Sequence, residues 1–137
     1  MVKFEGVYKG YICHVGLADC KTDVTSRETK IIIKEICDVE KCCKGYTFKQ
    51  IIYFKCEKVI VYGIATLNAK GDALIVAAET KKGKSPHLIF PEKEKCGIVE
   101  KIAVEGTFFD DKNHNLGVGV THAKRIEKCH DKHAIKY

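Results

Sequence analysis

The sequence lacks several features that would assign it to a familiar class of protein. It has no tryptophan and only two prolines, and none of its eight cysteines form a C-x-x-C pair. The missing pairs weaken the interpretations as a zinc finger or a thioredoxin-type redox protein. No apolar run approaches the roughly 20 residues that a membrane-spanning helix needs. No glycine-rich phosphate loop opens a helix either. We therefore expect no membrane partner and no standard nucleotide-binding loop.

Two further absences concern location and helices. The amino-terminal residues MVKFEGVYKG contain no apolar core of the kind that a secretory signal requires, so we expect a cytoplasmic protein. No segment places apolar residues at helical spacing over the length of an ordinary helix. This argues against a parallel α/β sheet, because parallel strands need long crossover connections that are usually helical.

Length and composition describe an ordinary globular chain. The hydrophobic fraction of 45% and the charged fraction of 31% in 137 residues are typical of a single folded domain. The 24 basic and 18 acidic residues give a net charge of +6, which permits an anionic partner without requiring one. We predict one domain over residues 1–137, with residues 127–137 as a mobile carboxyl-terminal tail.

Alternating apolar residues and regularly spaced turn signals predict strands along most of the chain. Residues 2–17 indicate two short strands or one bent strand, and Gly63 is an expected bulge or close-contact point. Residues 29–37, with three consecutive isoleucines, predict a strand but also fit a helix. The apolar run at 73–79 predicts a strand covered on both faces. We predict an all-β fold, a single-domain antiparallel sandwich or partly closed barrel with few or no helices. The other expected strands cover residues 46–56, 58–67 and 87–90, the last closed by Pro91.

Residues 97–126 predict the central hairpin, with a polar turn at 110–115. Ile98, Ile102, Val104 and Phe108 share one face of its first strand. The second strand has two distinct faces. One carries Leu116, Val118, Val120, His122 and Ile126, and the other carries Gly117, Gly119, Thr121 and Ala123.

Glycines inside a strand mark the close approach of a ligand or of another backbone. The small-residue face of this hairpin therefore predicts a ligand-binding site. For His122, which shares a face with Val118 and Val120, a buried structural histidine is the alternative interpretation. The candidate ligand-binding residues are Gly117, Gly119, Thr121, His122 and, in the turn, His114.

The phrase GIVEKIAVEG, followed by a polar turn and LGVGVTHAKRIEK, resembles half of a biotinyl/lipoyl-type hammerhead domain. The resemblance covers about 30 residues and places Lys124 roughly where that family carries its modified lysine. The methionines that flank the lysine in the biotin phrase are absent here, so the modification is not transferred. The whole chain is also similar to small archaeal β domains of unknown function, which implies a compact all-β fold.

Cys129, His130 and His133 form the densest group of metal-ligand types. Two histidines three residues apart converge on one metal if the chain turns, and the Cys13–Cys20 region offers a fourth ligand for zinc. A solvated tail without metal is the alternative. The cysteines as a whole have three interpretations, namely apolar fillers, disulfides and metal ligands. We expect most of them to be buried and reduced.

No complete catalytic constellation is visible, and no nucleophile elbow is present. We therefore predict a non-enzymatic module that binds a small ligand or a protein partner, with no cofactor. Exposed sheet edges make a homo-oligomer a reasonable expectation. One alternative is a metal-dependent enzyme or metal-binding protein that uses zinc or iron. The other alternative is an RNA-binding module whose aromatic and basic residues are Tyr46, Phe48, Lys49, Tyr53, Phe54 and Lys55.

Overall fold

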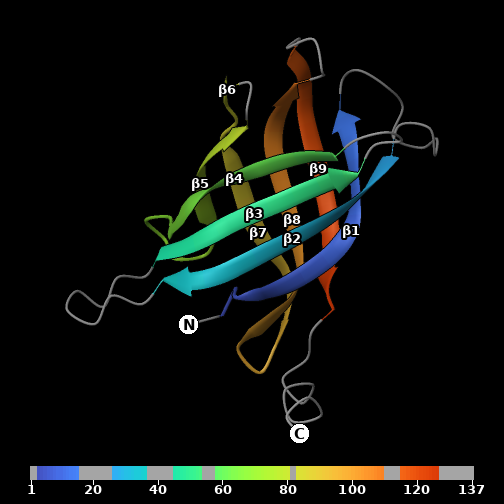
Figure 1. The fold of residues 1–137 in the computed structure, drawn as a ribbon. Coiled ribbons are helices and arrows are strands. Elements are labelled where there is room, and N and C mark those ends of the chain that lie inside the picture. Colours follow the sequence, from blue (N-terminus) through green and yellow to red (C-terminus); the bar gives the residue numbers. More distant parts are fainter. Residues whose placement is uncertain are drawn as a thin grey trace, which may run out of the picture.

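The computed structural model describes residues 3–15, 26–36, 45–53, 58–80, 83–109 and 115–126, and this part of the chain is all β (Figure 1). Side chains are described for these residues except 13–15, 26–27, 107–109 and 115–118. The predicted all-β class is confirmed, and residues 29–36 belong to a strand and not to a helix. The strands are β1 (Gly6–Val15), β2 (Ser26–Ile36), β3 (Gly45–Tyr53), β4 (Lys58–Leu67), β5 (Leu74–Thr80), β6 (Gly83–Lys84), β7 (His87–Lys95), β8 (Ile98–Phe109) and β9 (Asn115–Arg125).

The sheet closes on itself. Its order is β4-β3-β2-β1-β9-β8-β7-β5, and a β4–β5 pairing completes an eight-stranded antiparallel barrel. Strand β6 is a two-residue addition to β5. Apart from this addition, neighbours in the sheet are neighbours in the chain, and β1 meets β9 where the barrel closes. Of the two predicted alternatives, a sandwich and a partly closed barrel, the barrel is therefore the one that forms, and it is fully closed.

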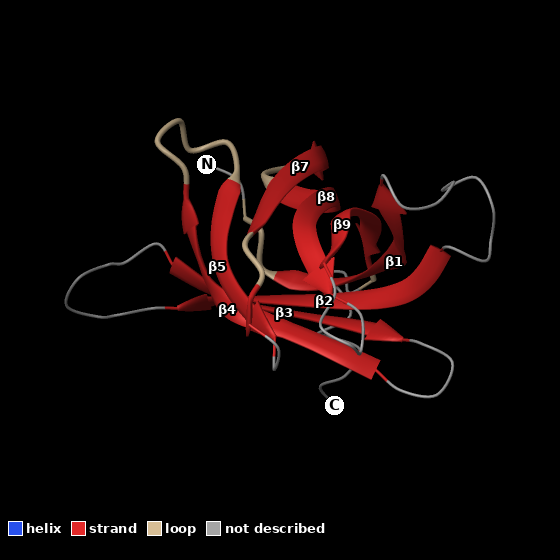
Figure 2. Cartoon of the chain, turned by 90° about the horizontal axis from the view of Figure 1, so that it is seen from above, coloured by secondary structure: helices blue, strands red, loops and turns tan. Residues whose placement is uncertain are grey.

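Gly10 in β1 and Gly63 in β4 allow each of these strands to belong to both walls of the barrel. In Figure 1 strands β2, β3 and β4 cross in front of β7, β8 and β9, and Figure 2 shows the two groups from above. A Cβ atom on Gly10 would lie 1.9 Å from the backbone oxygen of His122, and one on Gly63 would lie 2.1 Å from that of Ala77. Such backbone contacts are typical of glycine at a barrel corner. The close contact predicted at Gly63 is confirmed, and β1 is one bent strand.

The barrel interior is the hydrophobic core. Side chains from all eight strands fill it, as expected for a barrel of this size. Phe4, which precedes β1, is also fully buried, and a bridge between Lys3 and Ile98 joins this segment to β8. The largest fully buried apolar side chains are Phe4, Tyr8, Ile12, Ile31, Ile33, Phe48, Ile52, Leu74, Ile89 and Ile102.

Two strand predictions were wrong in an informative way. The β5 strand is covered on one face only, and Ile75 is 49% exposed, because no second layer covers the outside of an antiparallel barrel. The β7 strand continues through Pro91 to Lys95. Because β7 pairs with β5 only as far as Ile89, its later residues form an edge, where proline is tolerated.

The same β7 edge bears on the expected oligomer. Proline, a bulge between Pro91 and Glu94, and alternating charges at residues 92–95 all discourage pairing with another strand. Closure pairs the other long edges of the described strands. The physical argument for assembly through sheet edges is therefore weaker than the sequence suggested, and a homo-oligomer stays a prediction.

The central hairpin forms, but its faces differ from two expectations. Thr121 and Ala123 point into the core, whereas the His122 side chain is 59% exposed. The interpretation of His122 as a buried structural histidine was therefore wrong. In β8 the buried residue is Val99 and not Ile98, because the irregular pairing with β7 shifts the alternation before Ile102.

Candidate functional site

The barrel wall separates the residues predicted to bind a ligand. Gly119 and Thr121 face the interior, and His122 faces outward. The backbone of Gly117 pairs with Phe108 in the β8–β9 ladder. His114 lies outside the described residues. The predicted residues therefore do not form one site, because Thr121 and His122 lie on opposite sides of the wall.

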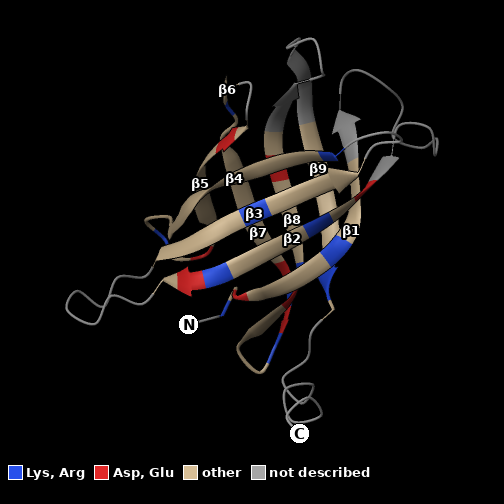
Figure 3. Ribbon diagram, in the orientation of Figure 1, with Lys and Arg blue, Asp and Glu red and all other residues tan. Residues whose placement is uncertain are grey.

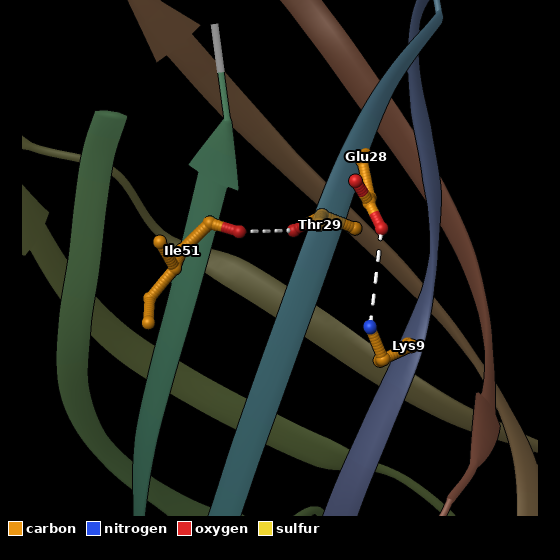
Figure 4. A network of polar contacts seen from close by, with 4 residues as sticks. All are labelled: Lys9, Glu28, Thr29 and Ile51. Carbon is orange, nitrogen blue, oxygen red and sulfur yellow. Dashed lines mark hydrogen bonds and ion pairs between the residues drawn. The ribbon is translucent and has the colours of Figure 1, made fainter. Parts of the chain in front are cut away.

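Inside the barrel, Thr121 belongs to a buried polar cluster with Gln50 and Thr29. The Thr29 hydroxyl donates to the carbonyl oxygen of Ile51 at 2.8 Å, so its own oxygen is left as an acceptor (Figure 4). Gln50 Nε2 donates to Thr29 at 3.1 Å and to Thr121 at 3.0 Å. These bonds join β3 to β2 and, across the interior, to β9. They also orient the amide, because the atom that faces Thr29 has to be a donor.

The cluster leaves one acceptor unsatisfied. Gln50 is fully buried, and its Oε1 atom has no hydrogen-bond partner in the described part of the chain. A buried carbonyl in this state costs about 1–3 kcal/mol. Both Gln50 N–H groups already donate hydrogen bonds within the cluster, so only Oε1 is left to bind a further group. The cluster therefore suits a small neutral group that donates to this oxygen. A water molecule is the simplest such group.

His87 of β7 forms a second interior feature. A Cβ atom on Gly106 would lie 2.4 Å from the His87 ring, so the glycine makes room for the imidazole. The ring lies 5.6 Å from that of Phe48, and Nδ1 lies 2.5 Å from the carbonyl oxygen of Ser85. Burial lowers the pKa of His87 below its usual 6.5, although the hydrogen bond with Ser85 opposes this shift. His87 is therefore a neutral core residue at pH 7.

Outside the barrel, strand register places five lysines side by side. We call them the lysine row: Lys30 of β2, Lys9 of β1, Lys124 of β9, Lys101 of β8 and Lys93 of β7. Each lysine is the direct register partner of the next across five adjacent strands. Lys9, Lys93 and Lys124 are exposed, and the other two are partly exposed. Figure 3 shows basic residues on the neighbouring strands β2, β1 and β9.

This arrangement is electrostatically unfavourable without a counter-charge, since like charges directly opposite each other destabilise a sheet. Among the described residues, only Lys9 of the row has a carboxylate within 4.0 Å, namely Glu28 at 3.9 Å (Figure 4). Both side chains of that pair are about half exposed, so solvent screens it. Four strand spacings of about 4.8 Å give the row a length of about 19 Å around the wall.

A second row of outward side chains runs beside the lysine row. Tyr11 and His122 are direct partners in the β1–β9 ladder, two residues beyond Lys9 and Lys124. Tyr11 is 64% exposed, and His122 Nδ1 lies 3.0 Å from Glu92 Oε1. The outer wall therefore combines cations with exposed rings. Sequence reasoning missed the lysine row because its members lie far apart in the chain, and only the register brings them together.

The other predicted residues are distributed as follows. Cys129, His130 and His133 lie outside the described residues, and within the described part no three His, Cys, Asp or Glu side chains could hold a metal ion together. The one cysteine whose side chain is described, Cys96, is exposed, and the expectation that most cysteines are buried and reduced stays a prediction. Of the residues expected to contact RNA, Tyr46 and Phe48 are buried, whereas Lys49 and Tyr53 are exposed.

Comparison of the sequence with models of known protein families and with curated proteins gives no match. In the described ranges the structure contains no helix long and apolar enough to cross a membrane.

Proposed function

We propose that this protein is a non-enzymatic binding module that holds an extended polyanion along the lysine row. The observation that carries the proposal is the direct register of the five lysines on adjacent strands. An anionic chain that follows the row neutralises charges that otherwise repel one another. The net charge of +6 supports the same partner, because it attracts anions from a distance.

The proposal is tested by titration with inorganic polyphosphate, a base-free chain, at several salt concentrations. We expect the affinity to fall steeply with added salt, because binding releases counterions. For single-stranded phosphate chains, each lost contact removes about 0.7 log units of affinity at 0.1 M salt, so losing two lysines costs about 25-fold. The double variant Lys9→Gln/Lys124→Gln removes the two central partners.

The matched control is Lys58→Gln/Lys84→Gln, which makes the same change of charge on β4 and β6, away from the row. We expect the control to bind within about threefold of the unmodified protein, because only long-range attraction is reduced. Equal losses in the two double variants would mean that net charge alone drives binding. That result would contradict a site at the lysine row.

A second candidate function is the binding of a small neutral molecule inside the barrel. The unsatisfied Gln50 Oε1 favours it, because a bound molecule that donates a hydrogen bond to this oxygen removes the cost of leaving the oxygen unpaired. Native mass spectrometry of the purified protein is expected to show a bound species that the Gln50→Met variant loses. If the protein carries no added mass, the cluster holds water and this candidate is dropped. The zinc or iron alternative and the cytoplasmic location stay predictions.

A further inference from the structure

Beside the lysine row, the outer wall presents aromatic rings at a regular distance. Tyr11 is the most exposed of the large apolar side chains on the described strands, at 64%. Its partner across the β1–β9 ladder is His122, whose side chain is 59% exposed. Ala103 follows on β8 and Phe90, 37% exposed, on β7. Three rings, with Ala103 and the carboxylate of Glu28 in the same row, therefore lie parallel to the lysine row on the same face.

The spacing of these rows suits a nucleotide. Residues two apart in a strand are separated by about 7 Å, so Tyr11 and His122 lie one such step from Lys9 and Lys124. A nucleotide likewise presents an anionic phosphate and, across the sugar, a flat base. Aromatic platforms beside a basic track are the usual means by which proteins bind single strands, because every base has a face that stacks.

The curvature of the wall favours a single strand over a duplex. The lysine row crosses five of the eight strands of a closed barrel, so it bends around the wall. Duplex DNA is stiff over about 150 base pairs and keeps its bases stacked inside. A stiff rod touches only part of a convex row, and it offers no free base to Tyr11.

We infer that the polyanion is a single-stranded nucleic acid, with phosphates on the lysine row and bases stacked on Tyr11 and His122. This inference rests on the proposed polyanion-binding function and adds the base to it. Of the aromatic residues expected from the sequence, Tyr46 and Phe48 have no part in the site because they lie in the core.

The experiment measures fluorescence anisotropy of a labelled oligouridine of about 12 nucleotides, with a duplex of equal length and inorganic polyphosphate as comparison ligands. Tyr11→Ala is expected to weaken oligouridine binding about tenfold or more, because a base loses its stacking partner. Its affinity for polyphosphate should stay within about twofold of the unmodified protein, because the lysines are intact.

Two further variants serve as controls for this result. Tyr62→Ala is the matched control, since Tyr62 is 50% exposed on β4, away from the row, and should change neither affinity. Tyr11→Phe keeps the ring and should keep the affinity for oligouridine. Circular dichroism and thermal unfolding of each variant show that the barrel is intact.

The outcomes separate the inference from the function on which it rests. If Tyr11→Ala binds oligouridine as tightly as the unmodified protein while Lys9→Gln/Lys124→Gln weakens both ligands, the inference is overturned and polyanion binding stands. If the duplex binds more tightly than the single strand, the inference is also overturned. If the double lysine variant weakens neither ligand, both the function and the inference are overturned.

Discussion

Arg125 and Tyr8 are direct partners in the β9–β1 ladder, and the guanidinium lies 5.0 Å from the centre of the tyrosine ring. Arg125 Nη2 donates to the Tyr8 hydroxyl at 2.9 Å, and Nε donates to the carbonyl oxygen of Val99 at 2.7 Å. The Tyr8 hydroxyl donates to the carbonyl oxygen of Phe4. These contacts join the first strand, the last strand, β8 and the segment before β1 where the barrel closes.

Replacing Arg125 with methionine is expected to destabilise the protein by about 2–4 kcal/mol. The substitution keeps the length of the side chain but removes both charged donors and the cation–π contact. Urea unfolding followed by circular dichroism measures the change. Lys124→Met, at the exposed neighbouring position, is the control and should stay within about 0.5 kcal/mol. Equal stabilities of the two variants would show that the Arg125 contacts contribute little.

Because of Tyr8, we expect the protein to lose stability in alkali. Burial raises the pKa of Tyr8 to about 12, although Arg125 opposes the shift. In the unfolded chain the phenol loses its proton near pH 10, so this contribution is complete below pH 10 and disappears as the pH rises through about 12. The loss amounts to about 3 kcal/mol.

The test is the free energy of unfolding of the unmodified protein and Tyr8→Phe between pH 9 and pH 12. The difference between the two proteins should shrink as the pH rises. Tyr11→Phe, at an exposed position, serves as the control. A difference between the unmodified protein and Tyr8→Phe that does not depend on pH would exclude Tyr8 as the source of the alkaline loss.

His87 predicts a loss of stability in acid. Burial lowers its pKa below the usual 6.5. Its contribution to stability is therefore present above pH 6.5 and is lost as the pH falls through the lowered value, because the unfolded chain binds the proton first. Nuclear magnetic resonance of the imidazole C–H groups is expected to show His87 titrating below pH 6.5 in the folded protein. A midpoint at or above 6.5 would contradict the neutral core histidine.

We expect any side chain at position 63 to overpack the structure severely. Its Cβ position lies 2.1 Å from the Ala77 oxygen, which belongs to backbone and cannot rotate away. We expect Gly63→Ala to lose about 3 kcal/mol or more in a thermal or urea unfolding experiment. Gly45→Ala is the control, because its nearest atoms would lie at ordinary contact distances of 3.7 and 3.8 Å, and it should change stability by less than about 1 kcal/mol. Similar losses of stability at both glycines would contradict the interpretation of Gly63 as a barrel corner.

Cys96 offers a stabilising substitution. Cys96 and Gly97 form the turn between β7 and β8, with φ values of 55° and 81°. Two left-handed residues in a two-residue hairpin turn favour Asn-Gly. Cys96→Asn is expected to raise the free energy of unfolding by about 0.5–1 kcal/mol, whereas Cys96→Val should lower it. If the Cys96→Asn variant is less stable than the unmodified protein, the strain assigned to Cys96 is wrong.

Local pattern predicted the strands well wherever turn residues flank an alternating run. The strand expected at 58–67 is β4 with the same bounds. The pattern misled at Pro91, because proline ends a strand only where its missing N–H is needed by a neighbour. It also misled at His122, whose apolar neighbours in sequence suggested burial. In both cases the answer depended on which strands lie beside the residue.

The amino-acid sequence by itself determined the all-β class and the bounds of strands such as β4, because alternation and turn chemistry are local properties of the chain. Only the tertiary structure decided that the sheet closes into a barrel, that Gln50 and Thr121 meet inside it, and that five lysines align outside it. Those features depend on register between strands that lie as far apart in the chain as β1 and β9. Shifting the register by one residue reverses the face of every side chain, so no single segment specifies such features.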